Sequence, residues 1–394
     1  MDSKNKNYKI LLTGGGTGGS VAPLLAIAEE LKTPSGSPLS GGGLKEGFEF
    51  FWLGTKFGLE REMVERAGIK FKAINGGKLR RYFSFKNLVD IVKIKIGFFQ
   101  ALFIMLKWRP DLVMSAGSFV SVPIVWAAWL LGVPVLIHQQ DIIPGLANKL
   151  MAPFAKTITV AFEKSLADYG KKAVWIGNPV RRSLKTPNPK SQFPIDANLP
   201  VVLIVGGGTG AMPINKLVKD SLGELTKFCQ VIHVTGKNKK INVILEPKAI
   251  ESHGLSTGQQ DSIGRYAPFR MINYNAFEFL NVNQMAEALN AADLIITRAG
   301  LGFLSELSFL GKPSIIIPMP DSHQEANAEF FKNKKAALVI GQKDLTAENF
   351  THMIKDLLSD EKMLGQLRMN MKNAMKPGAN QAMVKIVNKI LNLS

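Results

Sequence analysis

The sequence predicts an α/β fold made of two Rossmann-like halves. Short apolar runs recur along the chain, and each is followed by a glycine-containing turn and a helical pattern, as in parallel βα units. Two of these openings are similar and lie about half a chain apart, at residues 10–19 and 202–211. The length of 394 residues is too great for one ordinary core. Together these observations indicate two domains with parallel sheets.

Each predicted strand is an apolar run that ends at a turn. The strands are expected at Tyr8–Leu12, Leu112–Ser115, Pro134–Ile137, Val201–Val205, Val231–Thr235, Leu294–Thr297 and Ser314–Pro318. Helices are expected from about Val21 to Leu31 and, with an amphipathic pattern, over Asn380–Leu393. The longest apolar stretch, Val120–Ile137, contains two prolines and a glycine, so we interpret it as a buried loop and helix followed by a strand, not as a membrane span.

Composition indicates where the domains meet. Residues 1–183 are expected to form the N-terminal domain and residues 200–376 the C-terminal domain, because 184–199 is rich in proline and polar residues, as linkers are. Residues 377–394 are expected to form a helix that packs back on the N-terminal domain. A further loop-like stretch, Thr33–Gly47, has the composition of a surface insertion, and no function is assigned to it.

Charge and cysteine content exclude several classes of protein. The chain has 49 Lys and Arg against 31 Asp and Glu, a net charge of +18, and its 46% of hydrophobic residues argues against extensive disorder. The single cysteine, Cys229, excludes a disulfide-stapled scaffold and a multi-cysteine zinc site. The polar segment Met1–Ile10 lacks the apolar stretch of a signal peptide, so a reducing, cytoplasmic setting is expected. The excess positive charge requires an acidic partner.

The positive charge is concentrated between Lys78 and Arg109, where eight basic residues stand against one acidic residue, Asp90. The segment also holds the aromatic residues Tyr82, Phe83, Phe85, Phe98, Phe99, Phe103 and Trp108. Basic and large apolar side chains in alternation suit the headgroup boundary of an anionic bilayer. The alternative is a partly buried helix with a solvated basic face. Nucleic-acid binding is disfavoured because no zinc finger or RNP signature accompanies the charge.

Three glycine-containing turns, at residues 14–19, 206–211 and 298–303, are candidate phosphate sites. Glycine lets the backbone approach a ligand closely, and the amides at a helix N-terminus attract anions. The first two turns lack the Walker lysine, and the first lacks the acidic residue of an NAD site, so tight packing between strand and helix is the alternative for both. After the third turn, Glu306 could accept hydrogen bonds from ribose hydroxyls, or could be an ordinary surface carboxylate.

Polar side chains also follow two predicted strands, at the edge where α/β sheets bind ligands. His323, Gln324 and Asn327 are expected on a loop after Ser314–Pro318, and amide side chains suit sugar hydroxyls. His138 and Asp141 follow Pro134–Ile137 in the same way. A lone histidine is more often structural, but its position beyond a strand favours a role in a cleft.

In combination these motifs resemble the MurG family of glycosyltransferases. The resemblance runs in consistent order from Thr13 to about Ile340. The matching segments are residues 14–19 (GGGTGG), 77–80 (GKLR), 110–113 (PDLV), 117–123 (GSFVSVP), 138–141 (HQQD), 177–181 (GNPVR), 206–211 (GGGTGA), 298–300 (RAG) with 305–306 (SE), and 323–324 (HQ) with 327–328 (NA).

The resemblance implies a GT-B fold, in which two Rossmann-like domains face each other across a cleft. It implies an inverting enzyme that moves N-acetylglucosamine from UDP-N-acetylglucosamine to undecaprenyl-diphosphate-N-acetylmuramyl pentapeptide, converting lipid I to lipid II in peptidoglycan synthesis. No metal or cofactor is expected. The implied location is the cytoplasmic face of the plasma membrane, with an anionic membrane surface and cell-wall synthesis proteins as partners and no nucleic acid.

The resemblance also implies which residues bind the substrates. In the C-terminal domain, the backbone near Leu280 would meet the uracil, Glu306 the ribose, and Gln324 with Asn327 the sugar. The diphosphate would meet Arg181 and the amides of Gly300, Leu301, Gly302 and Phe303. The other implied donor contacts are Thr17, Gly18, Gly19, Asp141 and Gly208. The implied acceptor contacts are Gly15, Gly16, Thr17, Arg80, Ser118 and Phe119.

Three positions depart from the family pattern. Ser20 stands where the family usually has a histidine directly after the first glycine run, and unassisted serine is a poor base. Asp141 replaces an amide, and Gly208-Thr209 replaces Ser-Gln. We hypothesise that Asp141 is the catalytic base, with His138 as the second candidate. Two alternatives stay open: transfer to a different lipid acceptor, and a catalytically impaired membrane scaffold, against which the retained donor-site residues argue.

Overall fold

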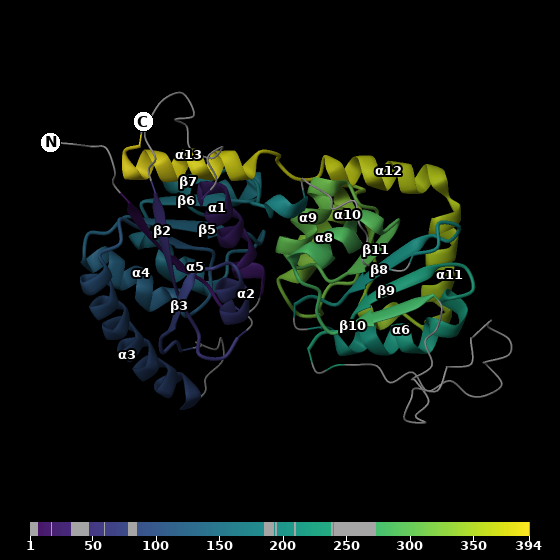
Figure 1. Cartoon of the computed structure of the whole chain (residues 1–394), viewed down its shortest axis with the longest axis horizontal. Coiled ribbons are helices and arrows are strands. Elements are labelled where there is room, and N and C mark those ends of the chain that lie inside the picture. The colour runs from purple at the N-terminus through teal and green to yellow at the C-terminus, as the bar shows by residue number, and fades with distance from the viewer. Residues whose placement is uncertain are drawn as a thin grey trace, which may run out of the picture. The chain divides into compact units, whose positions relative to one another are not determined.

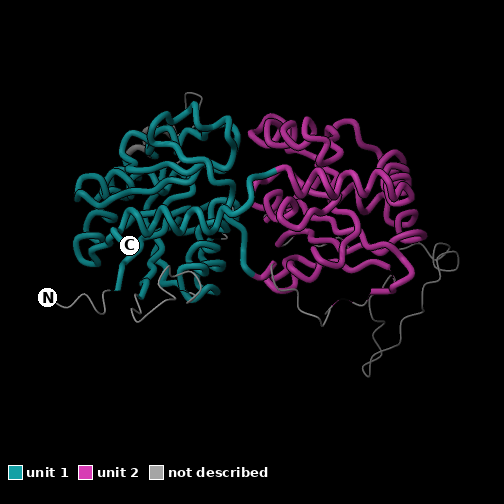
Figure 2. The backbone as a smooth tube through the Cα atoms, turned by 90° about the horizontal axis from the view of Figure 1, so that it is seen from above, with its two compact units in different colours: residues 1–182, 375–394 teal, residues 183–374 magenta. Residues whose placement is uncertain are grey.

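The chain divides into two compact units, coloured separately in Figure 2. Unit 1 comprises Met1–Arg182 and Met375–Ser394, and unit 2 comprises Ser183–Ala374. The computed structural model describes residues 7–16, 18–32, 47–58, 60–77, 85–184, 193, 195–208, 210–237, 239 and 273–393, with side chains omitted for 85–89 and 91.

Unit 1 is built on a seven-stranded parallel sheet in the order β3-β2-β1-β4-β5-β6-β7 (Figure 1). Its strands are β1 (Tyr8–Thr13), β2 (Phe48–Gly54), β3 (Lys70–Ala73), β4 (Leu112–Ser115), β5 (Val135–Gln139), β6 (Thr157–Val160) and β7 (Ala173–Trp175). Its α-helices are α1 (Ala22–Lys32), α2 (Glu60–Arg66), α3 (Phe85–Trp108), α4 (Ser121–Leu130), α5 (Leu146–Met151) and α13 (Ala379–Leu391).

The sheet of unit 1 is buried on both faces. In β1, Ile10 and Leu12 pack into one apolar cluster while Leu11, between them, packs into another, because alternate residues of a strand point to opposite faces. A sheet covered on both sides needs nearly continuous apolar strands, and every residue of β4 is buried. The apolar runs visible in the sequence are therefore the two-sided core of unit 1.

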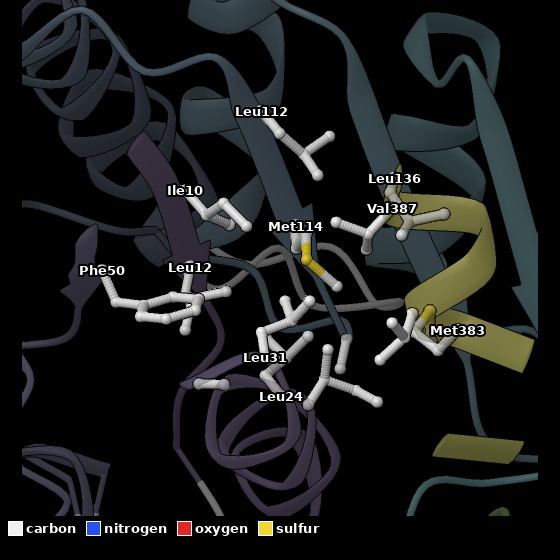
Figure 3. Packing of buried hydrophobic residues seen from close by; sticks show 14 of the residues in the cluster. Ile10, Leu12, Leu24, Leu31, Phe50, Leu112, Met114, Leu136, Met383 and Val387 are labelled. Carbon is white, nitrogen blue, oxygen red and sulfur yellow. The ribbon is translucent and has the colours of Figure 1, made fainter. Parts of the chain in front are cut away.

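The C-terminal helix α13 completes one of these clusters. Its Met383 and Val387 are fully buried, and Figure 3 shows them directed toward Leu136 and Met114 of the sheet. The helix also packs on α1. Its amphipathic pattern is thus explained by burial in unit 1, although unit 2 separates α13 from the rest of unit 1 in the sequence.

Unit 2 holds a six-stranded parallel sheet in the order β10-β9-β8-β11-β12-β13. Its strands are β8 (Val201–Val205), β9 (Gln230–Val234), β10 (Tyr274–Phe277), β11 (Leu294–Thr297), β12 (Ser314–Ile316) and β13 (Leu338–Val339). Its α-helices are α6 (Met212–Leu225), α8 (Val282–Ala291), α9 (Leu301–Leu310), α10 (Gln324–Asn333), α11 (Ala347–Ser359) and α12 (Glu361–Lys372).

The α/β prediction is confirmed, with two local differences. Strand β5 extends to Gln139, so His138 lies within a strand and not on the loop after it. Helix α10 begins at Gln324, where the Ser322 hydroxyl accepts a hydrogen bond from the Gln324 amide at 3.2 Å, so Gln324 and Asn327 are helical residues. Among the described residues, no helix is long and apolar enough to cross a membrane.

Candidate substrate-binding site

Each sheet has one position where the strand order reverses, between β1 and β4 in unit 1 and between β8 and β11 in unit 2. Open α/β sheets bind ligands in the crevice beyond the carboxyl ends of the strands at such a switch point. The glycine-containing turns predicted from the sequence follow β1, β8 and β11, so they lie at these two edges.

The first glycine turn is fixed by side chains that bind its backbone. The Gly14 carbonyl accepts a hydrogen bond from Nε1 of Trp52 at 3.1 Å, and the Gly16 amide donates to Oε2 of Glu60 at 3.2 Å. Gly16 has a φ of 84° and faces open space, since a Cβ built there would meet no atom within 4 Å. The turn is therefore rigid, and its exposed side is open to a ligand at Gly16.

Ser20 is one of the side chains that fix this turn. Its hydroxyl donates to the carbonyl oxygen of Gly15 at 3.3 Å. A hydroxyl whose proton points to a backbone carbonyl helps to hold the turn in place. This bond gives Ser20 a structural role, and its candidate catalytic role stays a prediction. Its neighbours Gly18 and Gly19 lie in a 3-10 turn, Gly18–Ser20, before α1.

A second turn at the same edge follows β4 and is also constrained. Gly117 has a φ of 97° and Ser118 a φ of 94°, a region that a non-glycine residue rarely adopts. The Ser121 hydroxyl donates to the Gly117 carbonyl at 3.0 Å and lies 3.1 Å from Oγ1 of Thr13 at the end of β1. These bonds join the two turns, so the candidate acceptor residues Gly15, Gly16 and Ser118 belong to one rigid edge.

The loop after β5 places Asp141 at this edge of unit 1. Nε2 of Gln139 donates to the backbone carbonyl of Asp141 at 2.7 Å, and Oε1 of Gln139 accepts a hydrogen bond from the Tyr169 hydroxyl at 3.1 Å. Gln139 is buried, whereas Asp141 is partly exposed. The loop therefore places Asp141, with its backbone fixed by Gln139, at the carboxyl end of the sheet.

His138 is buried in β5 and has both ring nitrogens occupied. Nε2 lies 2.7 Å from Oδ1 of Asn178, which can only accept, so we assign the proton to Nε2, and Nδ1 lies 3.0 Å from Oγ1 of Thr159. Burial lowers the pKa of His138 to about 4, against the opposing effect of the Asn178 hydrogen bond. A buried neutral histidine cannot reach a substrate hydroxyl, so the structure argues against His138 as the base.

His138 instead helps to position the segment that leads to Arg181. Asn178, its partner, is followed by Val180, whose amide and carbonyl both bond to the side chain of Asn380 in α13, at 3.0 and 2.9 Å. The segment is held between β5 and α13 as a result. Arg181 itself is partly exposed and belongs to unit 1.

In unit 2, the turn after β8 contains both a glycine that is needed for close packing and a glycine that is exposed. Gly207 and Gly210 have φ values of 91° and 70°, and a Cβ on Gly210 would lie 2.1 Å from the carbonyl oxygen of Thr235. Gly210 is therefore required for close packing against the end of β9, in agreement with the alternative explanation for part of this motif. Gly208, the candidate donor contact, is exposed at the tip of the turn.

The turn after β11 has the features expected of a diphosphate site. Gly300 caps α9 with a β-region conformation, and a Cβ built on it would meet no atom within 4 Å. Glu306 lies on the same helix and is only 2% exposed, so it is not an ordinary surface carboxylate. The turn thus combines the first amides of α9, open space beside Gly300 and a buried acidic side chain on the same helix.

Buried polar side chains hold this turn against its neighbours. Nη1 of Arg298 donates to the carbonyl oxygens of Ile317 and Pro318 at 3.0 and 2.9 Å, which ties the turn to the end of β12. Nδ2 of Asn327 donates to the carbonyl oxygen of Ala299 at 3.1 Å, and Asn327 is fully buried. The structure therefore gives Asn327 a bond to the backbone of the turn, where sequence reasoning expected only a sugar contact.

The other candidate donor residues lie around the same edge of unit 2. Leu280, after β10, and Leu301, at the start of α9, are buried, whereas Gly302 and Phe303 are partly exposed. Oε1 of Gln324 accepts a hydrogen bond from the Met319 amide at 3.1 Å, so the side chain is oriented at the start of α10.

Thr17 and Arg80 lie outside the described residues, as do Lys78 and Thr209. Within the residues that the structure describes, no group of three or more His, Cys, Asp or Glu side chains is arranged to hold a metal ion.

We predict that His138 makes unit 1 less stable in mild acid. Its pKa is about 4 in the fold against an ordinary value near 6.5, so the unfolded chain binds the proton more strongly. His138 therefore does not lower the free energy of unfolding above pH 6.5. It lowers that free energy by about 3 kcal/mol as the pH falls from 6.5 to 4. The free energy of unfolding of unit 1, measured with urea at several pH values, should no longer show this decrease in His138→Gln. His323→Gln, in unit 2, is the control, and an unchanged slope in the first variant would contradict the prediction.

Comparison with known proteins identifies the family of this chain. The glycosyltransferase family 28 N-terminal domain matches residues 10–160, and the family 28 C-terminal domain matches residues 201–386. A Clostridium kluyveri protein named UDP-N-acetylglucosamine–N-acetylmuramyl-(pentapeptide) pyrophosphoryl-undecaprenol N-acetylglucosamine transferase is 37% identical, over 98% of each chain. A Treponema denticola protein of the same name is 33% identical, over 91% of this chain and 90% of its own.

Solved structures show the same fold. The crystal structure of Acinetobacter baumannii MurG is 25% identical, covers 97% of this chain and 99% of its own, and superposes with a TM-score of 0.65. The Staphylococcus aureus MnaA–UDP structure has the same TM-score at 16% identity, with 98% of each chain covered, and supports the fold alone. The two domain matches and the full-length relatives show that the chain belongs to the MurG family within glycosyltransferase family 28.

Proposed function

We propose that this chain transfers N-acetylglucosamine from UDP-N-acetylglucosamine to undecaprenyl-diphosphate-N-acetylmuramyl pentapeptide. The main support for this proposal is full-length sequence similarity. The chain is 37% identical, over 98% of both chains, to a protein named for this reaction. The two switch-point edges described above support the proposal, because open α/β sheets bind ligands at such positions. The chain is accordingly a hexosyltransferase of peptidoglycan synthesis.

We assign the nucleotide sugar to unit 2. The turn Arg298–Gly300 combines open space at Gly300 with the first amides of α9, which suits a diphosphate. Glu306, on the same helix, is the candidate for the ribose hydroxyls because a carboxylate accepts two hydrogen bonds. Gln324, fixed through its carbonyl oxygen, is the candidate for the sugar, and the backbone near Leu280 for the uracil.

We assign the lipid diphosphate to unit 1. The two turns joined through Thr13 and Ser121 present Gly16 and Ser118 at the switch point of its sheet. Arg181 follows Val180, whose backbone is held by two hydrogen bonds to Asn380. Its guanidinium supplies a cation that can stabilise the leaving UDP. The strained backbone at Ser118 is consistent with a binding role, since strain persists where the surrounding structure enforces it.

The reaction proposed is a single displacement that inverts the anomeric carbon. The acceptor hydroxyl oxygen forms a bond to that carbon while the bond to the UDP oxygen breaks, and the hydroxyl proton passes to a base. Asp141 is the candidate base because its loop is fixed by Gln139 and its side chain is partly exposed. The hydrogen bonds of Ser20 and His138 described above favour Asp141 over these two residues.

The function is tested by measuring UDP release from UDP-N-acetylglucosamine with and without a soluble analogue of the lipid acceptor. Release is expected only when the acceptor is present, because the displacement needs its hydroxyl. UDP binding without acceptor-dependent release would favour the scaffold alternative. Release with another polyprenyl-diphosphate sugar, and not with this one, would favour the alternative of a different lipid acceptor.

Replacement of Asp141 by Asn tests the assignment of the base. The variant keeps the shape of the side chain but cannot accept the proton, so kcat should fall by roughly a hundred- to ten-thousand-fold. Binding of UDP to unit 2, measured by calorimetry, should be retained. Asp168→Asn, also in unit 1, is the matched control. Full turnover in Asp141→Asn would overturn the assignment.

We further propose that α3 rests on an anionic membrane surface. Its exposed residues Val92, Ile96, Phe99, Phe103 and Leu106 are spaced by four and three residues, so they form one stripe. The opposite side of the helix, with Ile94, Ala101 and Met105, is buried in unit 1. Exposed lysines flank the stripe, at Lys93, Lys95 and Lys107.

An exposed apolar stripe with flanking cations matches the boundary between anionic headgroups and acyl chains. Phe103 is 70% exposed and Phe99 57% exposed, so water contacts most of both rings in the free protein. Because the proposed acceptor is anchored in a bilayer, membrane contact by the same unit would bring the enzyme to its substrate.

Binding to vesicles that contain phosphatidylglycerol tests the membrane contact. Phe103→Ser should weaken binding by about tenfold or more, because burying a phenylalanine contributes about 1.5–3 kcal/mol. Raising the salt concentration should also weaken binding through screening of the lysines. Phe57→Ser is the control, since Phe57 is 83% exposed but lies outside α3. Equal binding by Phe103→Ser and the unchanged protein would contradict the proposal.

A further inference from the structure

Glu60, the first residue of α2, is a buried carboxylate at the proposed acceptor edge of unit 1. Its exposed fraction is 0%, and none of the ion pairs found among the described residues involves it. Carboxylates are seldom fully buried without a partner charge, because removing them from water is costly. A specific set of hydrogen bonds must therefore compensate for this burial.

Those hydrogen bonds come from the backbone of two loops. Oε2 of Glu60 accepts the amide of Gly16 at 3.2 Å, in the turn after β1. Oε1 accepts the amide of Thr55 at 3.0 Å and also the Thr55 hydroxyl, in the loop after β2. All three partners are donors, and an ionised carboxylate is a group that only accepts. The carboxylate thus joins the loop at Thr55 to the turn at Gly16, which lies 44 residues before Glu60 in the sequence.

The same carboxylate explains two of the glycines around it. A Cβ on Gly15 would lie 2.7 Å from Oε1 of Glu60, and a Cβ on Gly58 would lie 1.9 Å from Oε2. Neither contact is sterically possible without movement of the backbone or the carboxylate. Gly15 therefore makes room for Glu60, whereas Gly16, with open space beside it, faces the position that a ligand would take.

We propose that Glu60 is a positioning residue for the lipid-diphosphate acceptor. By holding the Gly16 amide inward, the carboxylate fixes the peptide planes of the glycine turn, so that the remaining groups of the turn face the substrate without a prior rearrangement. Both oxygens of Glu60 already accept hydrogen bonds from Gly16 and Thr55, so Glu60 acts on the substrate through the turn. This inference rests on the proposed function in one respect, the assignment of the acceptor to unit 1.

The variant Glu60→Gln separates this role from general stability. Its amide oxygen can replace one carboxylate oxygen, but its NH₂ group would face either the Gly16 amide or the Thr55 amide, so one donor would lose its acceptor. The KM for the acceptor analogue should rise by roughly tenfold or more, while the KM for UDP-N-acetylglucosamine should change by less than about twofold. Glu62→Gln is the matched control, because Glu62 lies on the same helix but is exposed and pairs with Arg66 at the surface.

Hydrogen exchange of the full-length protein provides a second readout. In Glu60→Gln, the amides of Gly16 and Thr55 should exchange faster, while those of β4 and β5 keep their protection. If Glu60→Gln does not fold, Thr55→Val is the second variant. It removes the hydroxyl bonds to Glu60 and to the Phe57 carbonyl but keeps the bond from the Thr55 amide, and the acceptor KM should still rise relative to the unchanged protein.

An unchanged acceptor KM in Glu60→Gln, or equal rises in both KM values, would overturn the positioning role. Failure of the proposed function is distinguishable, because the unchanged protein would then release no UDP with the acceptor analogue. In that case hydrogen exchange at Gly16 still decides whether Glu60 fixes the turn, and unaltered exchange there would refute the inference.

Discussion

Both units depend on parallel sheets that are buried on both faces. Such a sheet can expose its polar backbone and side chains only at its edges, because apolar residues must cover each face. Most of the described strands lead through a turn into a helix, and the carboxyl ends of the parallel strands of each sheet meet at one edge. The positions where the strand order reverses, between β1 and β4 and between β8 and β11, are where the turns can diverge and admit a ligand.

The buried polar side chains near these edges have a common role. Glu60 binds the turn after β1, His138 holds Asn178, and Arg298 with Asn327 holds the turn after β11. Each one satisfies a backbone or amide group that would otherwise lose its hydrogen bond on leaving water. The flexible glycine turns thereby acquire fixed geometry, and the groups left facing outward are backbone amides and a few side chains. Substrate binding then requires little ordering of the protein, which would otherwise weaken it.

Much of the fold could be predicted from the sequence because burial leaves a periodic pattern. The strands Leu112–Ser115, Val201–Val205 and Leu294–Thr297 were expected with the bounds observed, since each is a short apolar run ended by a turn. The position of His138 within β5 was missed, because a polar residue inside a strand looks like the start of a loop. Its burial depends on Asn178 and Thr159, which are distant in sequence.

The candidate site was predictable only in part. Glycine turns mark places where the backbone needs freedom, but the sequence does not say whether a ligand or a side chain fills the space. At Gly16 and Gly300 that space is open, whereas at Gly15 it is filled by Glu60 and at Gly210 by the end of β9. The role of Glu60 was not visible in the sequence, since its partner Gly16 lies 44 residues away. The packing explanation therefore holds at Gly15 and Gly210, whereas ligand binding at Gly16 and Gly300 stays a prediction.

We assign the nucleotide sugar to the edge of unit 2 and the lipid diphosphate to the edge of unit 1. A crystal structure of the full chain with UDP-N-acetylglucosamine tests this assignment. The diphosphate should lie against the backbone of Gly300–Phe303, with the ribose hydroxyls at Glu306. A nucleotide bound at the glycine turn after β1, with the turn after β11 empty, would contradict the claim.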